Sequence, residues 1–263
     1  MVCLVHQNEW RSVWVKTLAK LNKNVLINIS YHGTKFYGYA VQNDYETVQS
    51  KLQDALAWIY ESKIYVNASG RTDKGVHAIN QYISFYIDDR ISIEKLREIL
   101  NRYGQNKWYI KWIKEVDRNF HARFSAKAKT YLYLIDYCAN NPLFYDHAWI
   151  VNFQLDFDLI KKAIPILEGT HNFWSFSTAD KDKGLRTIHK INLKQEDNKV
   201  YIYITGDGFL RSMVRMIVGA LYNIGIKKYD LNHLKWLLDN PKKGRAITKA
   251  PASGLYLYEV YYE

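Results

Sequence analysis

Cysteine is scarce in this sequence, and several familiar motifs are missing from it. The two cysteines, Cys3 and Cys138, are too few for a disulfide framework or a cysteine-ligated zinc site, and they favour a reducing compartment. The eight histidines have no HExxH-type spacing, and neither a dinucleotide fingerprint nor a P-loop is present. We therefore expect neither a metal ion nor a bound cofactor.

Long apolar runs are absent as well. No stretch approaches the roughly 20 apolar residues that are needed to span a bilayer. Residues 1–24 contain Glu9, Arg11 and Lys16 among scattered apolar residues, so they lack the apolar centre of a secretory signal. These absences predict a cytoplasmic protein without a membrane segment.

Basic and aromatic residues are abundant. Lys and Arg number 37 against 26 Asp and Glu, which gives a formal net charge of +11, and aromatic residues make up 15% of the chain. A positive surface attracts phosphates, and exposed bases stack on aromatic rings, so this combination suits structured RNA with unpaired nucleotides. A basic enzyme with an aromatic core would have the same composition, so composition alone leaves both interpretations open.

The 263 residues alternate between strand-like and helix-like patterns. Strands are predicted over 25–31, 81–87, 130–137, 200–205 and 255–262, and helices over 47–60, 92–102, 156–167, 208–224 and 230–239. The simplest architecture has two α/β domains, 25–140 and 141–263, with a cleft between them and a boundary near Asn140. Residues 1–24 form an N-terminal extension of unknown role.

One octet carries most of the chemical information. Residues 70–77 read Gly-Arg-Thr-Asp-Lys-Gly-Val-His, and the two glycines permit a tight backbone path that places Asp73 on a loop. An aspartate in such a setting is ordinarily a turn residue. The whole octet, however, resembles the signature loop of the TruA family of tRNA pseudouridine synthases, in which the aspartate is the essential residue.

Further segments resemble the same family in the same order. They are 31–38 (Tyr-His-Gly to Phe-Tyr-Gly), 47–49 (Thr-Val-Gln), 120–124 (Phe-His-Ala-Arg-Phe), 129–133 (Lys-Thr-Tyr-Leu-Tyr), 169–173 (Gly-Thr-His-Asn-Phe), 186–188 (Arg-Thr-Ile), 208–215 (Gly-Phe-Leu-Arg-Ser-Met-Val-Arg), Ala250-Pro251 and Gly254-Leu255. The resemblance extends from about Val25 to the C-terminus. Two departures are Lys74, where alanine is common, and the turn 101–104.

The resemblance implies an α+β fold of two α/β domains, each with a mainly antiparallel sheet, and a basic cleft between them. It also implies a cofactor-independent, homodimeric isomerase that converts uridine to pseudouridine in the anticodon stem-loop of tRNA, at tRNA positions 38–40. Its carboxylate either attacks the anomeric carbon of the sugar or promotes loss of the base, and the sequence leaves both routes open.

The resemblance also suggests roles for individual side chains. Asp73 is the expected nucleophile, Tyr131 the tyrosine that stacks on the target base, and Arg71 the side chain that fills the space left by the extruded nucleotide. Arg215 is the expected cationic partner of Asp73, because an opposite charge nearby favours an ionised carboxylate. Arg211, four residues earlier on the predicted helix, is expected to contact tRNA. Tyr133 is the alternative to Tyr131.

Two other functions compete with this interpretation. A non-catalytic RNA-binding protein on the same scaffold would bind RNA without needing Asp73. A nucleoside hydrolase or glycosidase would usually need a second carboxylate, whereas the loop supplies Arg71 and Lys74 instead.

Overall fold

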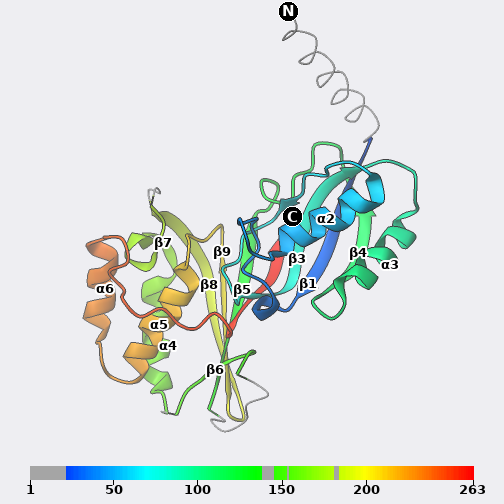
Figure 1. Ribbon diagram of the computed structural model, residues 1–263. Coiled ribbons are helices and arrows are strands. Elements are labelled where there is room, and N and C mark those ends of the chain that lie inside the picture. The colour runs from blue at the N-terminus through cyan, green and yellow to red at the C-terminus, as the bar shows by residue number, and fades with distance from the viewer. Residues whose placement is uncertain (1–21, 138–144, 153, 181–183) are drawn as a thin grey trace, which may run out of the picture.

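The computed structural model describes residues 22–137, 145–152, 154–180 and 184–263, and a single ten-stranded sheet runs through them (Figure 1). The main strand order is β4-β1-β3-β10-β5-β9-β8-β7, with β2 paired to β3 and β6 paired to β5. The strands are β1 (Lys23–Tyr31), β2 (Asn67–Ala68), β3 (His77–Ile87), β4 (Trp108–Glu115), β5 (Ala128–Asp136), β6 (Trp149–Ile150), β7 (Gly169–Asn172), β8 (Leu185–Glu196), β9 (Lys199–Gly206) and β10 (Leu255–Tyr261).

The helices lie in two groups beside this sheet. The α-helices are α2 (Val48–Tyr60), α3 (Ile93–Gly104), α4 (Phe157–Leu167), α5 (Met213–Gly225) and α6 (Leu231–Asp239), and the 3-10 helices are η1 (Gly33–Lys35) and η3 (Phe173–Phe176). Helices α2 and α3 lie near β1, β3 and β4, whereas α4, α5 and α6 lie near β7, β8 and β9 (Figure 1). The central strands β10 and β5 therefore lie between the two helix groups. No helix in the described residues is long and apolar enough to cross a membrane.

The predicted α+β class with a mainly antiparallel sheet is confirmed. All strand ladders are antiparallel except β10 with β3 and β5 with β6. Alternate strand residues such as Ile27, Tyr133 and Ile202 are almost completely buried, as expected when one face of each strand packs against helices. These residues belong to one continuous core cluster.

Helix starts follow local capping chemistry. Thr47 accepts a hydrogen bond from the backbone of Ser50, and the Ser50 side chain accepts one from the backbone of Thr47, which forms a capping box at the start of α2. Ser92 caps α3 and Asp156 caps α4 through the same kind of side-chain bond to the third residue of the helix. These bonds satisfy backbone donors that have no partner within the helix.

The C-terminal strand connects the two halves of the sheet. Strand β10 pairs with β3 on one side and with β5 on the other, so the last strand of the chain lies between two earlier ones. The predicted boundary at Asn140 lies outside the described residues, and the division into domains 25–140 and 141–263 stays a prediction. Strand β1 begins at Lys23, so the last two residues of the predicted extension 1–24 belong to the sheet.

One predicted helix begins later than its sequence pattern indicates. The apolar periodicity predicted a helix from Gly208, but α5 begins at Met213. Ser212 has a φ of 63°, in the left-handed region, and the carbonyl of Arg211 accepts a hydrogen bond from the backbone of Thr178 (3.1 Å). Arg211 therefore lies in the turn before α5 and not on the helix with Arg215, and that part of the prediction was wrong.

Candidate active site

The loop that carries Asp73 connects β2 to β3, and its backbone is held from several sides. The carbonyl of Thr72 accepts a hydrogen bond from the Tyr39 backbone (3.0 Å), and the Thr72 hydroxyl bonds to the Tyr31 hydroxyl (2.8 Å). The side-chain amide of Gln81 donates to the carbonyl of Gly70 (2.7 Å). The position of Asp73 is therefore fixed by buried residues of β1 and β3.

Two glycines allow the segment after β1 to lie directly against this loop. A Cβ atom on Gly33 would lie 2.1 Å from the carbonyl oxygen of Val76. A Cβ on Gly38 would lie 2.9 Å from the carbonyl oxygen of Thr72, and Gly38 also has a φ of +89°. Both distances are too short for a side chain. The motif segment 31–38 is thus a structural support for the Asp73 loop.

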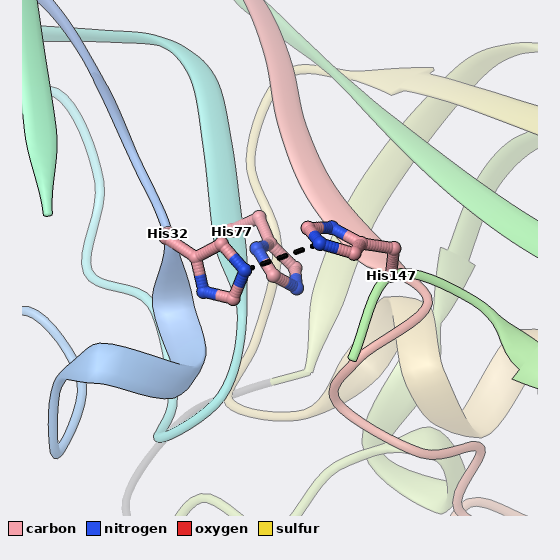
Figure 2. Close-up of side chains that lie close together, drawn as sticks. All are labelled: His32, His77 and His147. Atoms are coloured by element: carbon pink, nitrogen blue, oxygen red, sulfur yellow. Dashed lines mark hydrogen bonds between the residues drawn. The ribbon is translucent and has the colours of Figure 1, made fainter. Parts of the chain in front are cut away.

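Three histidines from separate segments anchor the far end of the loop (Figure 2). Ring nitrogens of His32, His77 and His147 lie within 4.8 Å of one another. The Nδ1 atom of His77 accepts from the Gly33 backbone (3.2 Å), so its Nε2 atom carries the proton and donates to the carbonyl of Asp146 (2.8 Å). Burial is the main cause that lowers the pKa of His77 to about 4 and also lowers that of His32. Both nitrogens of His77 are thus engaged, and the neutral ring holds Gly33 against the loop.

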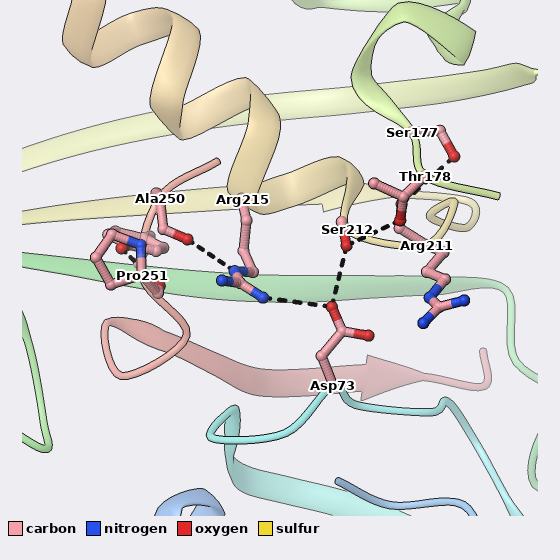
Figure 3. A network of polar contacts seen from close by, with 9 residues as sticks. Asp73, Ser177, Thr178, Arg211, Ser212, Arg215, Ala250 and Pro251 are labelled. Carbon is pink, nitrogen blue, oxygen red and sulfur yellow. Dashed lines mark hydrogen bonds and ion pairs between the residues drawn. The ribbon is translucent and has the colours of Figure 1, made fainter. Parts of the chain in front are cut away.

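The Asp73 carboxylate lies between two donors (Figure 3). Its Oδ2 atom accepts from the Ser212 hydroxyl at 3.1 Å and lies 3.5 Å from Nη1 of Arg215. The Nε atom of Arg215 donates to the carbonyl of Ala250 (2.7 Å), which orients the guanidinium. The side chain of Asp73 is 33% exposed and that of Arg215 is 12% exposed. The cation is therefore largely shielded from water, while the carboxylate remains open to a substrate.

The N-terminus of α5 adds to this positive environment. Ser212 occupies the N-cap position of α5, and Arg215 lies in the first turn of the helix. The unpaired backbone amides at a helix N-terminus carry partial positive charge and favour a nearby anion. The predicted pairing of Asp73 with Arg215 is present in the structure, and Ser212 is a third member that the sequence interpretation missed. Only the fold reveals it, because 139 positions separate Ser212 from Asp73.

Two tyrosines of β5 compete for a role at this site. Tyr131 and Tyr133 are two residues apart on one strand and point to the same face of the sheet. Tyr133 is completely buried, and its hydroxyl donates to the carbonyl of Pro251 (2.8 Å). The hydroxyl of Tyr131 makes no hydrogen bond within the described part of the chain, and its ring packs edge-on against Phe209. The structure thus leaves Tyr131, and not Tyr133, with a hydroxyl available for a substrate.

Tyr131 lies close to the start of the Asp73 loop. A Cβ atom on Gly70 would lie 3.7 Å from the hydroxyl of Tyr131 and 4.0 Å from Nζ of Lys129. Burial, followed by the nearby Tyr31 and Asp73, raises the pKa of Tyr131. Tyr131 is therefore a neutral hydroxyl at physiological pH and can act as a donor.

Lys129 is a second residue that the sequence interpretation did not single out, although it stands inside the quoted motif 129–133. Burial, and to a smaller extent the charge of Arg123, lowers its pKa to about 8. A lysine with such a pKa exchanges protons near neutral pH far more readily than an exposed one. Its motif position was the available signal, but only burial shows that its ammonium group is desolvated.

Arg71 and Arg211, which together with Tyr131 were predicted to contact the substrate, are both exposed. Arg71 lies on the loop two residues before Asp73, and among the described residues its guanidinium has no hydrogen bond or ion pair. The Arg211 side chain extends from the turn before α5 toward the side on which Asp73 lies (Figure 3). Both positions leave a guanidinium accessible to a phosphate beside the carboxylate.

Together these groups form an arrangement for chemistry at an electrophilic carbon. A carboxylate held by Ser212 and Arg215 can act as a nucleophile, and the nearby Tyr131 and Lys129 can hold or move protons.

Comparisons with known proteins agree with this arrangement. A family model described as tRNA pseudouridine synthase matches residues 27–125 and 163–263. The chain is 98% identical over its whole length, and over the whole of the relative, to a protein of Mycoplasmoides gallisepticum named tRNA pseudouridine synthase A. Proteins of the same name from Mycoplasma genitalium (42% identity, 89% of this chain and 97% of the relative) and Thermotoga maritima (39%, 91% and 100%) are also similar.

Proposed function

Because this chain belongs to the family of tRNA pseudouridine synthases, we propose that it modifies uridines of the anticodon stem-loop, with Asp73 as the nucleophile. The family activity makes the chain an isomerase that converts uridine of tRNA to pseudouridine. The observation that carries the assignment of Asp73 is its carboxylate, one-third exposed and held by Ser212 and Arg215.

The reaction rearranges one nucleotide without adding or removing atoms. The bond from C1′ of the ribose to N1 of uracil breaks, the base turns, and a bond from C1′ to C5 forms. The proton on C5 is then lost, and N1 regains one. The carboxylate of Asp73 serves either by attacking C1′ or by promoting loss of the base, and Arg215 favours its ionised form in both routes.

The neighbouring side chains serve the base and the RNA. Tyr131 stacks against the target base, and its hydroxyl, which is neutral because burial raises its pKa, takes part in the later proton transfer. Arg71 occupies the space left when the target nucleotide leaves the helical stack, which is required because a stacked base cannot be reached. Arg211 contacts a phosphate near the entrance to the site. The net charge of +11 supports binding in a basic cleft between two domains.

The same resemblance leads us to propose a homodimer in the cytoplasm, with one tRNA contacting both subunits. Light scattering of the purified protein during size-exclusion chromatography measures the mass directly. A mass of one chain at micromolar concentration would contradict the dimer and leave the proposed chemistry intact.

The decisive experiment incubates the protein with bulk tRNA and maps pseudouridine by a chemical adduct and primer extension. The wild-type protein should create adduct stops in the anticodon stem-loop. Asp73→Asn should fold and bind tRNA but form no pseudouridine, because an amide lacks the negative charge of the nucleophile. Substantial turnover by Asp73→Asn would refute the role of Asp73. Absence of pseudouridine with the wild-type protein, despite RNA binding, would favour a non-catalytic RNA-binding protein.

A further inference from the structure

A second concave site lies on the C-terminal half, away from the Asp73 carboxylate. It is a cavity of about 240 Å³ between α5, α6 and the segment 245–248. Sites for drug-sized ligands usually measure roughly 300–1,000 Å³, so this cavity suits one ring system. Neither the mechanism above nor the family motifs 208–215 and 250–251 use its walls.

One wall of the cavity is a row of aromatic rings. The rings of Tyr229 and His233 are stacked with centroids 4.3 Å apart, and those of His233 and Trp236 are nearly parallel at 5.8 Å. The guanidinium of Arg245 lies over the Trp236 ring, 4.5 Å from its centroid. Trp236 is nevertheless 45% exposed. Flat rings and a guanidinium plane are the surfaces on which bases of single-stranded RNA stack.

The floor of the cavity supplies hydrogen-bonding groups. Asn223 is 97% buried, since its relative exposure is 3%, and its amide nitrogen donates to the Thr248 hydroxyl (2.8 Å). The Oδ1 atom of Asn223 has no hydrogen-bond partner in the part of the chain that the structure describes. This oxygen is not one of the fully buried side-chain atoms that lack a partner, so it is reachable from the cavity that Asn223 lines and can accept a hydrogen bond from a ligand or from water. The edge of a nucleobase carries such donors.

The charge around the cavity favours a polyanion. Residues 227–249 contain seven Lys or Arg and only two Asp, so this short segment accounts for a large share of the excess positive charge of the chain. An apolar peptide would gain little from this field, whereas an RNA strand releases counterions when lysines neutralise its phosphates.

We propose that this cavity binds one unpaired nucleobase of the RNA substrate, distinct from the uridine that reacts at Asp73. The proposal rests on the proposed function, since it takes the substrate to be RNA. The cavity and the active site share one segment of chain: Thr248 lines the cavity, and Ala250 accepts the hydrogen bond that orients Arg215. A base in the cavity therefore fixes the RNA relative to the catalytic groups.

The test compares three variants in tRNA binding and steady-state turnover. Trp236→Ala removes the largest exposed ring of the cavity, and Trp236→Phe restores an aromatic surface. Trp58→Ala is the matched control, because Trp58 is also on a helix and is 73% exposed. Loss of one stacked base should weaken tRNA binding about tenfold. Trp236→Ala should therefore raise Kd and KM about tenfold while kcat at saturating tRNA is retained, and Trp236→Phe should recover most of the affinity.

Ultraviolet crosslinking of bulk tRNA to the wild-type protein, followed by tryptic digestion and mass spectrometry, locates the contact. A nucleotide adduct on the peptides 229–235 or 236–242, which carry the aromatic wall, supports the cavity, whereas adducts confined to other peptides would overturn it. Wild-type affinity of Trp236→Ala, or equal weakening by Trp58→Ala, would also overturn it. A wild-type protein that forms no pseudouridine but still gives an adduct on 229–235 or 236–242 would contradict the proposed enzyme activity and leave the base-binding cavity supported.

Discussion

Lys129 provides the sharpest quantitative test of the site as the structure describes it. Burial lowers the pKa of its ammonium group from 10.5 to about 8, which means that the folded protein pays free energy to keep this lysine charged at neutral pH. Lys129→Met retains a long, flexible apolar side chain and removes the charge. We therefore expect Lys129→Met to unfold less readily than the wild-type protein.

The size of the effect follows from the shift in pKa. A difference of about 2.5 pKa units at about 1.36 kcal/mol per unit gives an upper limit of about 3 kcal/mol. Residual exposure of the ammonium group to water reduces this value, so we expect a gain of about 1–3 kcal/mol in the free energy of unfolding at neutral pH. That is a large change for a single substitution outside the hydrophobic core.

The pH dependence of the stability difference between Lys129→Met and the wild-type protein tests independently whether the substitution stabilises the fold. Below about pH 8 the lysine is protonated in both the folded and the unfolded protein, so the full free-energy cost of burying its charge is present. Between about pH 8 and pH 10.5 the folded protein releases the proton while the unfolded chain keeps it, and this cost shrinks as pH rises. The stability advantage of Lys129→Met should therefore be greatest near neutral pH and disappear toward pH 10.5.

Urea unfolding followed by circular dichroism measures this difference, with the free energies extrapolated from matched m-values. Lys127→Met is the control, because Lys127 precedes Lys129 by two residues and is exposed. Its stability should differ little from wild type at any pH. A Lys129→Met protein that is less stable than wild type at neutral pH, or a gain in stability that does not change with pH, would refute the inference that desolvation of Lys129 destabilises the folded protein.

The remaining predictions concern turnover and binding. Tyr131→Phe should keep tRNA affinity and lose turnover. Tyr133→Phe should instead lose about 1 kcal/mol of stability, because the Pro251 carbonyl loses its hydrogen-bond donor. Normal turnover by Tyr131→Phe with impaired turnover by Tyr133→Phe would reverse the assignment of the active-site tyrosine. Arg215→Met should lower kcat about a hundredfold or more without global unfolding, because Asp73 loses its cationic partner. Arg211→Met should mainly weaken tRNA binding. Equal effects of the two variants on kcat would argue against the Asp73 to Arg215 pairing. Affinity for tRNA should fall by more than about tenfold between about 50 and 200 mM salt, and a flat dependence in filter binding would leave the net charge of +11 unrelated to RNA.

Local sequence signals predicted most elements of the fold. The helices that begin after Thr47 and Ser92 were found because a capping side chain and an apolar stripe are both encoded within one short segment. Strand β8 (Leu185–Glu196) was missed, because its register shifts between Ile188 and Lys190 and interrupts the alternation that marks a strand. The start of α5 was misplaced for a similar reason, since an apolar stripe does not reveal the left-handed turn at Ser212.

The sequence by itself determined the family, the Asp73 loop and its expected partner Arg215, because these depend on residue types at fixed spacings along the chain. The tertiary structure decided which groups surround that carboxylate. It brought Ser212 to Asp73 across 139 positions, gave the hydroxyl of Tyr133 to a backbone carbonyl, and placed β10 between two earlier strands. Burial and contacts between distant segments arise only when the chain packs, so the desolvated Lys129 and the aromatic cavity at Trp236 could not be seen before the fold was known.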